Sequence, residues 1–210
     1  PQGALFGRSA SGGAIAVATN EPGPDWGGEA AVGIGNGFTW TADGVVNAPL
    51  SDRVQVRLAG SYRNSEGFIR NSFLDKKVDG QISRNLRLKA PMVLSETATF
   101  KLRASWAEEE GGAAYISSGN VTGLYGGRLA GDALTDPFGD FEGRSDRNYW
   151  GVQATYEQLL GDTLSLSWTG GYDEYHKDFV EELDFRNDTP ITLGGIPLFP
   201  DGIQPISQPV

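Results

Sequence analysis

Apolar residues recur at every second position along most of this chain, in runs that approach ten residues. This is the period of a β-strand with one apolar and one polar face. The clearest run places Val54, Val56, Leu58, Gly60 and Tyr62 on the same face. Glycine fills 30 of the 210 positions, which disfavours long helices. The alternation therefore predicts an all-β fold without helices.

Seven segments carry this alternation and are expected to form an up-and-down antiparallel sheet. They are residues 30–34, 38–48, 54–62, 82–88, 98–106, 150–156 and 164–172. Strands of soluble proteins average about 5–6 residues, and several of these segments are longer. At ~3.4 Å per residue and ~40° tilt, residues 54–62 rise roughly 20 Å, close to the ~25 Å apolar band of an outer-membrane barrel. The lengths predict a transmembrane β-barrel segment of about seven long strands.

Short and long connections alternate between these strands. Tight turns are expected at residues 49–52, 92–96 and 160–162, and long connections at 64–77, at 108–148 and from 177 onward. The first connection, near residues 36–37, is the one short exception on the long-loop side. Membrane barrels have short turns at one end and long loops at the other, so the connections favour the same fold.

Large aromatic residues share the apolar side of their strands and are expected to form a belt near the long loops. Membrane barrels carry such belts where the strands leave the lipid. A soluble β-sandwich also alternates, but it does not predict aromatics at one edge. The belt residues are Trp40, Tyr62, Trp106, Trp150, Trp168 and Tyr172.

The formal net charge of −10 argues against a nucleic-acid partner. The expected polar face nevertheless carries a basic stripe, which a closed barrel would turn into its lumen. Such a stripe either attracts an anionic solute or pairs with acids of a plug or of neighbouring strands, and the second interpretation is favoured. The stripe comprises Arg57, Arg63, Arg87, Lys89, Lys101 and Arg103.

Catalytic and metal-binding residue sets are scarce in this sequence. There is no cysteine and one histidine, His176, which removes thiolate nucleophiles and histidine-based zinc sites. We expect no enzyme, no cofactor and no metal site. Candidate ligand contacts are Tyr115, Tyr125, Tyr175 and His176, because these side chains are expected in or beside the long loops, where aromatic rings can stack on the rings of a ligand.

The first 22 residues carry the most specific motif of the chain. A Pro-Gln-Gly, a Leu-Phe-Gly-Arg and a Gly-Gly precede an Ile/Val run that ends in threonine, and Pro22 follows. This combination resembles the end of the plug domain of TonB-dependent outer-membrane receptors. Residues 46–68 resemble the first periplasmic turn, third strand and second loop of that family's barrel. The matching head residues are Gly3, Leu5, Phe6, Gly7, Arg8, Gly12, Gly13, Ile15, Val17 and Thr19.

The resemblance implies that residues 1–22 end a plug domain and that residues 23–210 begin a transmembrane barrel of about 22 strands. It implies a fragment of a receptor of the bacterial outer membrane that imports a scarce solute by energised remodelling of the plug. The implied partners are outer-membrane lipid, a small-molecule or siderophore ligand, and the inner-membrane TonB complex, whose contact segment is expected outside this chain. Ferric siderophore, haem, cobalamin and oligosaccharide all remain open as the solute. The alternatives are a passive porin or autotransporter barrel, which has no plug, and a soluble carbohydrate-binding β-sandwich.

Overall fold

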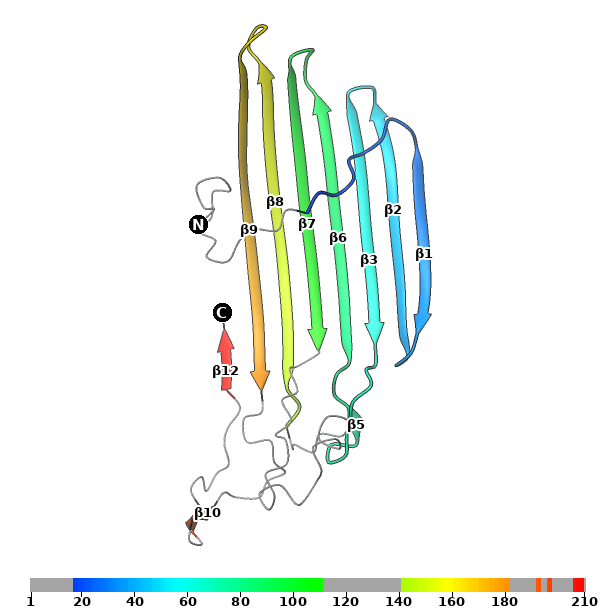
Figure 1. The fold of residues 1–210 in the computed structure, drawn as a ribbon, viewed down its shortest axis with the longest axis vertical. Coiled ribbons are helices and arrows are strands. Elements are labelled where there is room, and N and C mark those ends of the chain that lie inside the picture. The colour runs from blue at the N-terminus through cyan, green and yellow to red at the C-terminus, as the bar shows by residue number, and fades with distance from the viewer. Residues whose placement is uncertain (1–16, 112–140, 182–191, 194–195, 198–205, 210) are drawn as a thin grey trace.

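One antiparallel sheet dominates the fold, and its strands follow one another in chain order, β1-β2-β3-β6-β7-β8-β9-β12 (Figure 1). The computed structural model describes residues 17–111, 141–181, 192–193, 196–197 and 206–209. The main strands are β1 (Gly27–Gly35), β2 (Thr39–Ser51), β3 (Val54–Ser65), β6 (Gln81–Val93), β7 (Ala98–Gly111), β8 (Arg144–Leu159) and β9 (Ser165–Glu181). Each corresponds to one of the seven predicted segments, and only residues 38 and 164 of those segments fall just outside their strands. The prediction of an up-and-down all-β sheet is confirmed.

The shorter strands lie toward the end of the main sheet that is opposite the tight turns (Figure 1). β4 (Arg70–Asn71) pairs with β5 (Lys76–Lys77), and β10 (Thr192–Leu193) pairs with β11 (Ile196–Pro197). β12 (Ile206–Pro209) pairs with the end of β9 and adds an eighth strand that the sequence did not predict. Its four residues are too few to show an alternating pattern. Among the described residues, no helix is long and apolar enough to cross a membrane.

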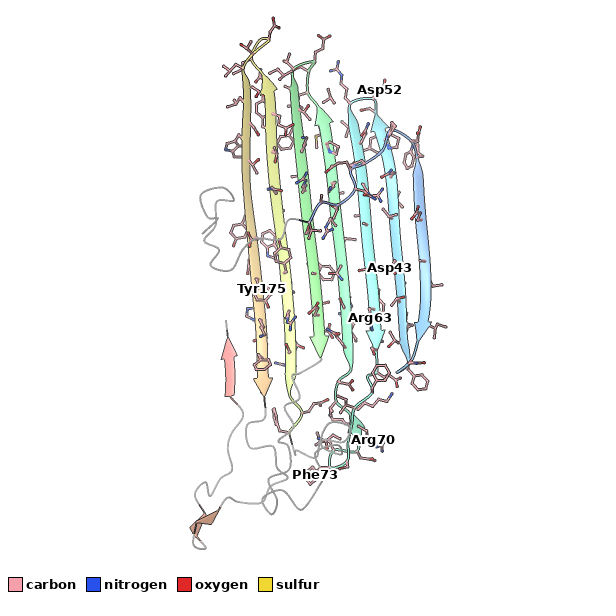
Figure 2. The ribbon with its side chains drawn as sticks, in the orientation of Figure 1. Asp43, Asp52, Arg63, Arg70, Phe73 and Tyr175 are labelled. Carbon is pink, nitrogen blue, oxygen red and sulfur yellow. The ribbon has the colours of Figure 1, made fainter. Side chains whose placement is uncertain are left out.

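Tight turns join β2 to β3, β6 to β7 and β8 to β9 at one end of the sheet, whereas the long connection from β3 to β6 and the short turn from β1 to β2 lie at the other end (Figure 1). At the first tight turn, the hydroxyl of Ser51 accepts hydrogen bonds from the backbone N–H groups of Arg53 and Val54, which fixes the reversal locally. Figure 2 shows Asp52 at this end, and Arg70 and Phe73 at the opposite end. The predicted alternation of the connections is therefore present.

Two strands extend further into the predicted long loop than expected. Residues 108–111 still belong to β7 and residues 144–148 to β8, and the two segments pair with each other. These ends are polar on both faces, so they lack the apolar period by which the sequence marks a strand. The predicted loop at 108–148 is therefore shorter than expected by the residues that β7 and β8 take up.

The register gives the sheet an apolar face and a polar face. Even-numbered residues of the seven long strands form the apolar face, and odd-numbered residues form the polar face. Leu58 lies opposite Val46 and Leu88, for example, while Arg57 lies opposite Asn47 and Lys89. Side chains on the apolar face stay uncovered: Val32 is 88% exposed and Ile34 95%. An apolar surface of this extent is unfavourable in water. The sheet therefore needs lipid or another apolar cover on this face.

Aromatic residues cross the apolar face in two rows. Near the long connections, the rings of Trp40 and Tyr62 are 4.6 Å apart and those of Trp150 and Tyr172 are 5.2 Å apart. Trp168 does not belong to this belt, contrary to the prediction. Trp168 lies near the start of β9, just after the tight turn that joins β8 to β9, and it pairs in register with Tyr156. Along β8, Trp150 and Tyr156 are about 20 Å apart at ~3.4 Å per residue, so the apolar face has an aromatic row at each end.

Arg84 interrupts the apolar face just beyond the belt. Its guanidinium donates to Glu108 at 2.6 Å and to Glu110, and it lies 5.9 Å from the centre of the Tyr62 ring. A charged cluster at this height fits the polar boundary that follows an interfacial aromatic row. The paired carboxylates account for an arginine on an otherwise apolar face.

Candidate functional site

The six bases of the predicted stripe all lie on the polar face. Three of them stand directly opposite one another on neighbouring strands: Arg57 on β3 pairs in register with Lys89 on β6, and Lys89 with Arg103 on β7. Like charges that lie directly opposite across strands repel each other. This row of three bases therefore requires compensating anions or acceptors.

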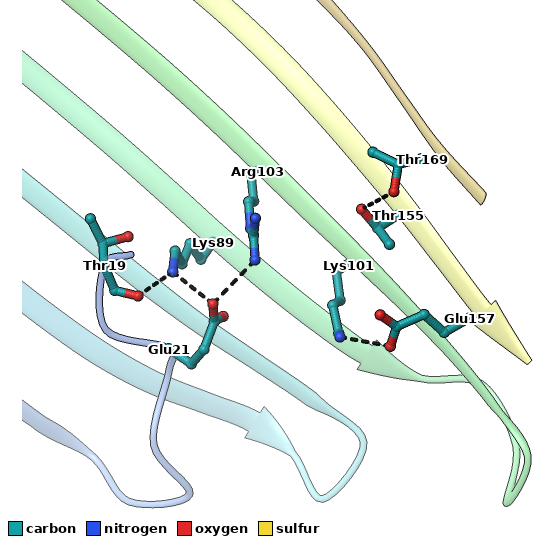
Figure 3. A network of polar contacts seen from close by, with 8 residues as sticks. All are labelled: Thr19, Glu21, Lys89, Lys101, Arg103, Thr155, Glu157 and Thr169. Carbon is teal, nitrogen blue, oxygen red and sulfur yellow. Dashed lines mark hydrogen bonds and ion pairs between the residues drawn. The ribbon is translucent and has the colours of Figure 1, made fainter. Parts of the chain in front are cut away.

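The segment that precedes β1 crosses the polar face and supplies those groups (Figures 1 and 3). The Glu21 carboxylate lies 2.7 Å from the Lys89 ammonium and 3.3 Å from the Arg103 guanidinium. The Lys89 ammonium also donates to the backbone carbonyl oxygen of Thr19 at 2.6 Å. The third base, Arg57, donates to the side-chain oxygen of Asn47 at 3.0 Å. These contacts hold residues 19–21 against β6 and β7.

Lys89 is the most enclosed member of the row, with a side chain only 7% exposed. A buried ammonium is costly unless it is paired and hydrogen-bonded. Glu21 is 55% exposed, so water screens its side of the ion pair. The contact therefore matters most for the lysine, which loses an anionic partner if the segment moves away.

Acid should release this contact. The hydrogen bond from the Lys89 ammonium holds the pKa of Glu21 below its ordinary value, although burial acts in the opposite direction. A lowered pKa means that the contact is complete at neutral pH, where the carboxylate is ionised, and is lost only when the pH falls through that lowered pKa. A spin label at Asn20→Cys in the full-length protein should become more mobile as the pH is lowered stepwise from 7 until Glu21 is protonated. In a Glu21→Gln background the label should already be mobile at pH 7 and should respond little to acid; the same acid response in both proteins would refute this role of Glu21.

The other bases of the stripe have different surroundings. Lys101 pairs with Glu157 on β8 at 2.7 Å. Arg87 is exposed and lines a cavity of about 710 Å³ together with Lys89, Arg103, Tyr149 and Asp173. The walls of this cavity also include residues 17–19 of the crossing segment. Part of the basic stripe is thus paired with acids, and part borders an open cavity.

A second polar region closes the long-connection end of β3 and β6. The Asp79 carboxylate accepts hydrogen bonds from the backbone N–H groups of Phe68 and Ile69 at 2.8–2.9 Å, and this folds residues 66–79 back on themselves. The hydroxyl of Thr39 donates to that of Ser65 at 2.8 Å beneath the loop. A cavity of about 520 Å³ beside the loop is lined by charged residues that include Lys77, Glu110, Glu142, Arg144 and Asp146.

The candidate ligand residues do not come together as one site. Tyr115 and Tyr125 lie outside the described residues. Tyr175 and His176 belong to β9 rather than to a loop, and as neighbours in a strand they face opposite sides of the sheet. Tyr175 pairs in register with Tyr149 on the polar face, whereas His176 lies 3.5 Å from Asp178 on the other face. A ligand on the polar face has access to Tyr175 and not to His176.

The specific part of the head motif also lies outside the described residues. This concerns Gly3, Leu5, Phe6, Gly7, Arg8, Gly12 and Gly13, whereas Val17 and Thr19 are described. Within the described ranges, no three histidine, cysteine, aspartate or glutamate residues form a group that would hold a metal ion.

Glu21 and Asp79 are the functional candidates that sequence reasoning missed. Each makes its contacts through a single carboxylate in an irregular segment, where no periodicity marks it. The one signal for Glu21 in the sequence was its position next to Pro22, where the head segment passes to the sheet. In the structure Pro22 is buried.

Comparison with known proteins supports the fold. No family model and no curated protein matches this chain. Among solved structures, the ferric-catecholate import receptor Fiu of E. coli K12, in its open form, superimposes with a TM-score of 0.66 at 19% sequence identity. The match covers 86% of this chain, and the chain spans 28% of that receptor. The likeness shows that the chain is folded as a segment of a β-barrel.

Proposed function

We propose that this chain is part of a TonB-dependent outer-membrane receptor that imports a scarce solute. The observation that carries the proposal is the segment at residues 17–26, which crosses the polar face of the sheet and is tied there by Glu21. In a closed barrel the polar face lines the interior, so this segment connects an internal domain to the wall. The motif in residues 1–22, which resembles the end of a plug, supports the same arrangement.

In this function, the solute binds among the outer loops and the tips of the plug. The TonB complex then remodels the plug and opens a path along the polar face. The apolar face meets the lipid between its two aromatic rows. The chain's own residues would bind, guide and seal, and we propose no catalytic activity for it. The solute remains one of four classes: ferric siderophore, haem, cobalamin or oligosaccharide.

The two alternatives fit the structure less well. A passive porin or autotransporter barrel offers no reason for a head segment that is anchored inside the wall. A soluble carbohydrate-binding sandwich requires a second sheet over the apolar face, and among the described residues no such sheet covers it. The importer accounts for both faces at once.

The proposal predicts uptake that depends both on this receptor and on TonB. The first step is to read the coding DNA on both sides of the segment, where we expect a signal peptide and plug upstream and further alternating strands downstream. Cells with and without the gene are then supplied with labelled ferric catecholate, haemin, cyanocobalamin or a maltodextrin as the sole source of the limiting nutrient. At least one probe should enter only cells that contain both the receptor and TonB.

Uptake of a small passive solute serves as the control and should stay unchanged in all strains. Full uptake of every probe in cells that lack TonB would overturn the proposal. An open reading frame limited to these 210 residues would overturn it as well.

A further inference from the structure

The row formed by Arg57, Lys89 and Arg103 places three cations side by side across β3, β6 and β7. Neighbouring strands lie about 4.8 Å apart, so each base is within short range of the next. Repulsion between like charges at such positions destabilises a sheet. A row of this kind is stable when an anion bridges its members, and it is therefore suited to holding one.

A carboxylate already occupies the row. One oxygen of Glu21 contacts both Lys89 and Arg103, at 2.7 and 3.3 Å. This is the geometry of one oxyanion shared between two cations, and charge-assisted contacts of this kind are the strong ones. Glu21 brings a single negative charge to three positive ones, and Arg57 has a neutral acceptor, Asn47. The row keeps an excess of positive charge even with Glu21 in place.

We infer that Arg57, Lys89 and Arg103 form an anion-binding site on the inner wall, which Glu21 of the head segment occupies until an anionic group of the solute replaces it. The use of the site by a solute rests on the proposed importer function. The site itself rests on the contacts. The expected ligand groups are oxyanions such as carboxylates, catecholates or phosphates.

The arrangement of the remaining bases gives the site a direction. Arg87 lies two residues from Lys89 toward the long connections, and it lines the same cavity. Lys101 lies two residues from Arg103 toward the tight turns. An anion that enters from the long-connection end meets Arg87 first, then the row, then Lys101. When the head segment moves, Glu21 is withdrawn and Lys89 is exposed. The path therefore opens at the same time as its wall begins to attract anions.

Sulfate binding to the full-length receptor in detergent tests the site, because sulfate is a small dianion at every pH used. By isothermal titration calorimetry at pH 7, Glu21→Gln should bind sulfate about tenfold more tightly than the wild type, the equivalent of about one regained charge-assisted contact. Adding Lys89→Gln to Glu21→Gln should remove the gain. The matched control is Glu157→Gln, which frees Lys101, a single cation outside the row; its affinity for sulfate should stay at the wild-type level.

A second arm needs no substitution. As the pH is lowered stepwise from 7 and Glu21 takes up its proton, the wild type should gain affinity for sulfate toward that of Glu21→Gln. An equal gain in sulfate affinity in Glu157→Gln would overturn the site. So would the absence of any gain in sulfate affinity both in Glu21→Gln and in the acidified wild type. Sulfate binding requires neither TonB nor transport. Failure here would therefore remove the anion site and leave the importer standing, whereas TonB-independent uptake would remove the importer and leave the site.

Discussion

Replacing Leu88 with lysine should destabilise the full-length protein in lipid vesicles by about 2–4 kcal/mol, the cost of a charge near the middle of a barrel's lipid-facing band. Leu88 lies on the apolar face between Leu58 and Ala104 of the neighbouring strands, midway between the two aromatic rows. A lysine at this depth has no aqueous boundary within easy reach. Chemical unfolding in vesicles, followed by tryptophan fluorescence, measures the loss.

Two control substitutions separate membrane depth from a general effect of lysine. Asn85→Lys lies on the polar face of the same strand and should change stability by no more than about 0.5 kcal/mol. Ile82→Lys lies on the apolar face but beyond Arg84, at the polar boundary, and should cost about 0–1 kcal/mol. Equal losses at positions 82 and 88, or a stability that does not depend on lipid, would contradict a lipid-facing surface.

Much of the fold was predictable because a single physical pattern repeats along the chain. Each long strand alternates between an apolar and a polar face, and side chains such as Leu58 and Arg57 sort to opposite faces as the period of two requires. Tight turns were predictable where Pro49, Ser51 and Asp52 interrupt the alternation. Local composition thus determined the order of the strands and which end of the sheet carries the turns.

Features that depend on pairing across the chain were not predictable. Glu21 contacts Lys89 at a separation of 68 residues, and nothing in the sequence near either residue marks its partner. Arg84 weakens the alternation of β6, and its place becomes clear only when Glu108 and Glu110 lie beside it. The prediction for Trp168 was wrong because an even or odd residue number specifies the face on which a side chain lies. It does not specify the position of the side chain along the strand.

Substitution of Gly67 by alanine should unfold the loop at residues 66–79 locally. Gly67 has a φ of +84°, a conformation that costs an ordinary residue about 1–3 kcal/mol. A Cβ there would also lie 2.8 Å from the carbonyl carbon of Asp79 and closer still to its carboxylate. With the additional cost of overpacking, the total loss is about 2–6 kcal/mol. Because the Asp79 carboxylate holds the Phe68 and Ile69 amides, exchange of these amides with solvent should accelerate about 30-fold or more.

Gly161 is the matched control for this substitution, because it has a φ of +82° in the last tight turn and a Cβ added there would meet no neighbouring atom within 4 Å. Gly161→Ala therefore carries the conformational cost of about 1–2 kcal/mol without the clash, and it should leave amide exchange in residues 66–79 unchanged. Hydrogen exchange of the full-length protein, read by mass spectrometry on peptides from both regions, compares the two variants. Wild-type protection of Phe68 and Ile69 in the Gly67→Ala protein would show that Asp79 does not organise the loop. Loss of that protection, confined to the Gly67 variant, would establish the loop as a unit whose fold depends on one carboxylate and one glycine.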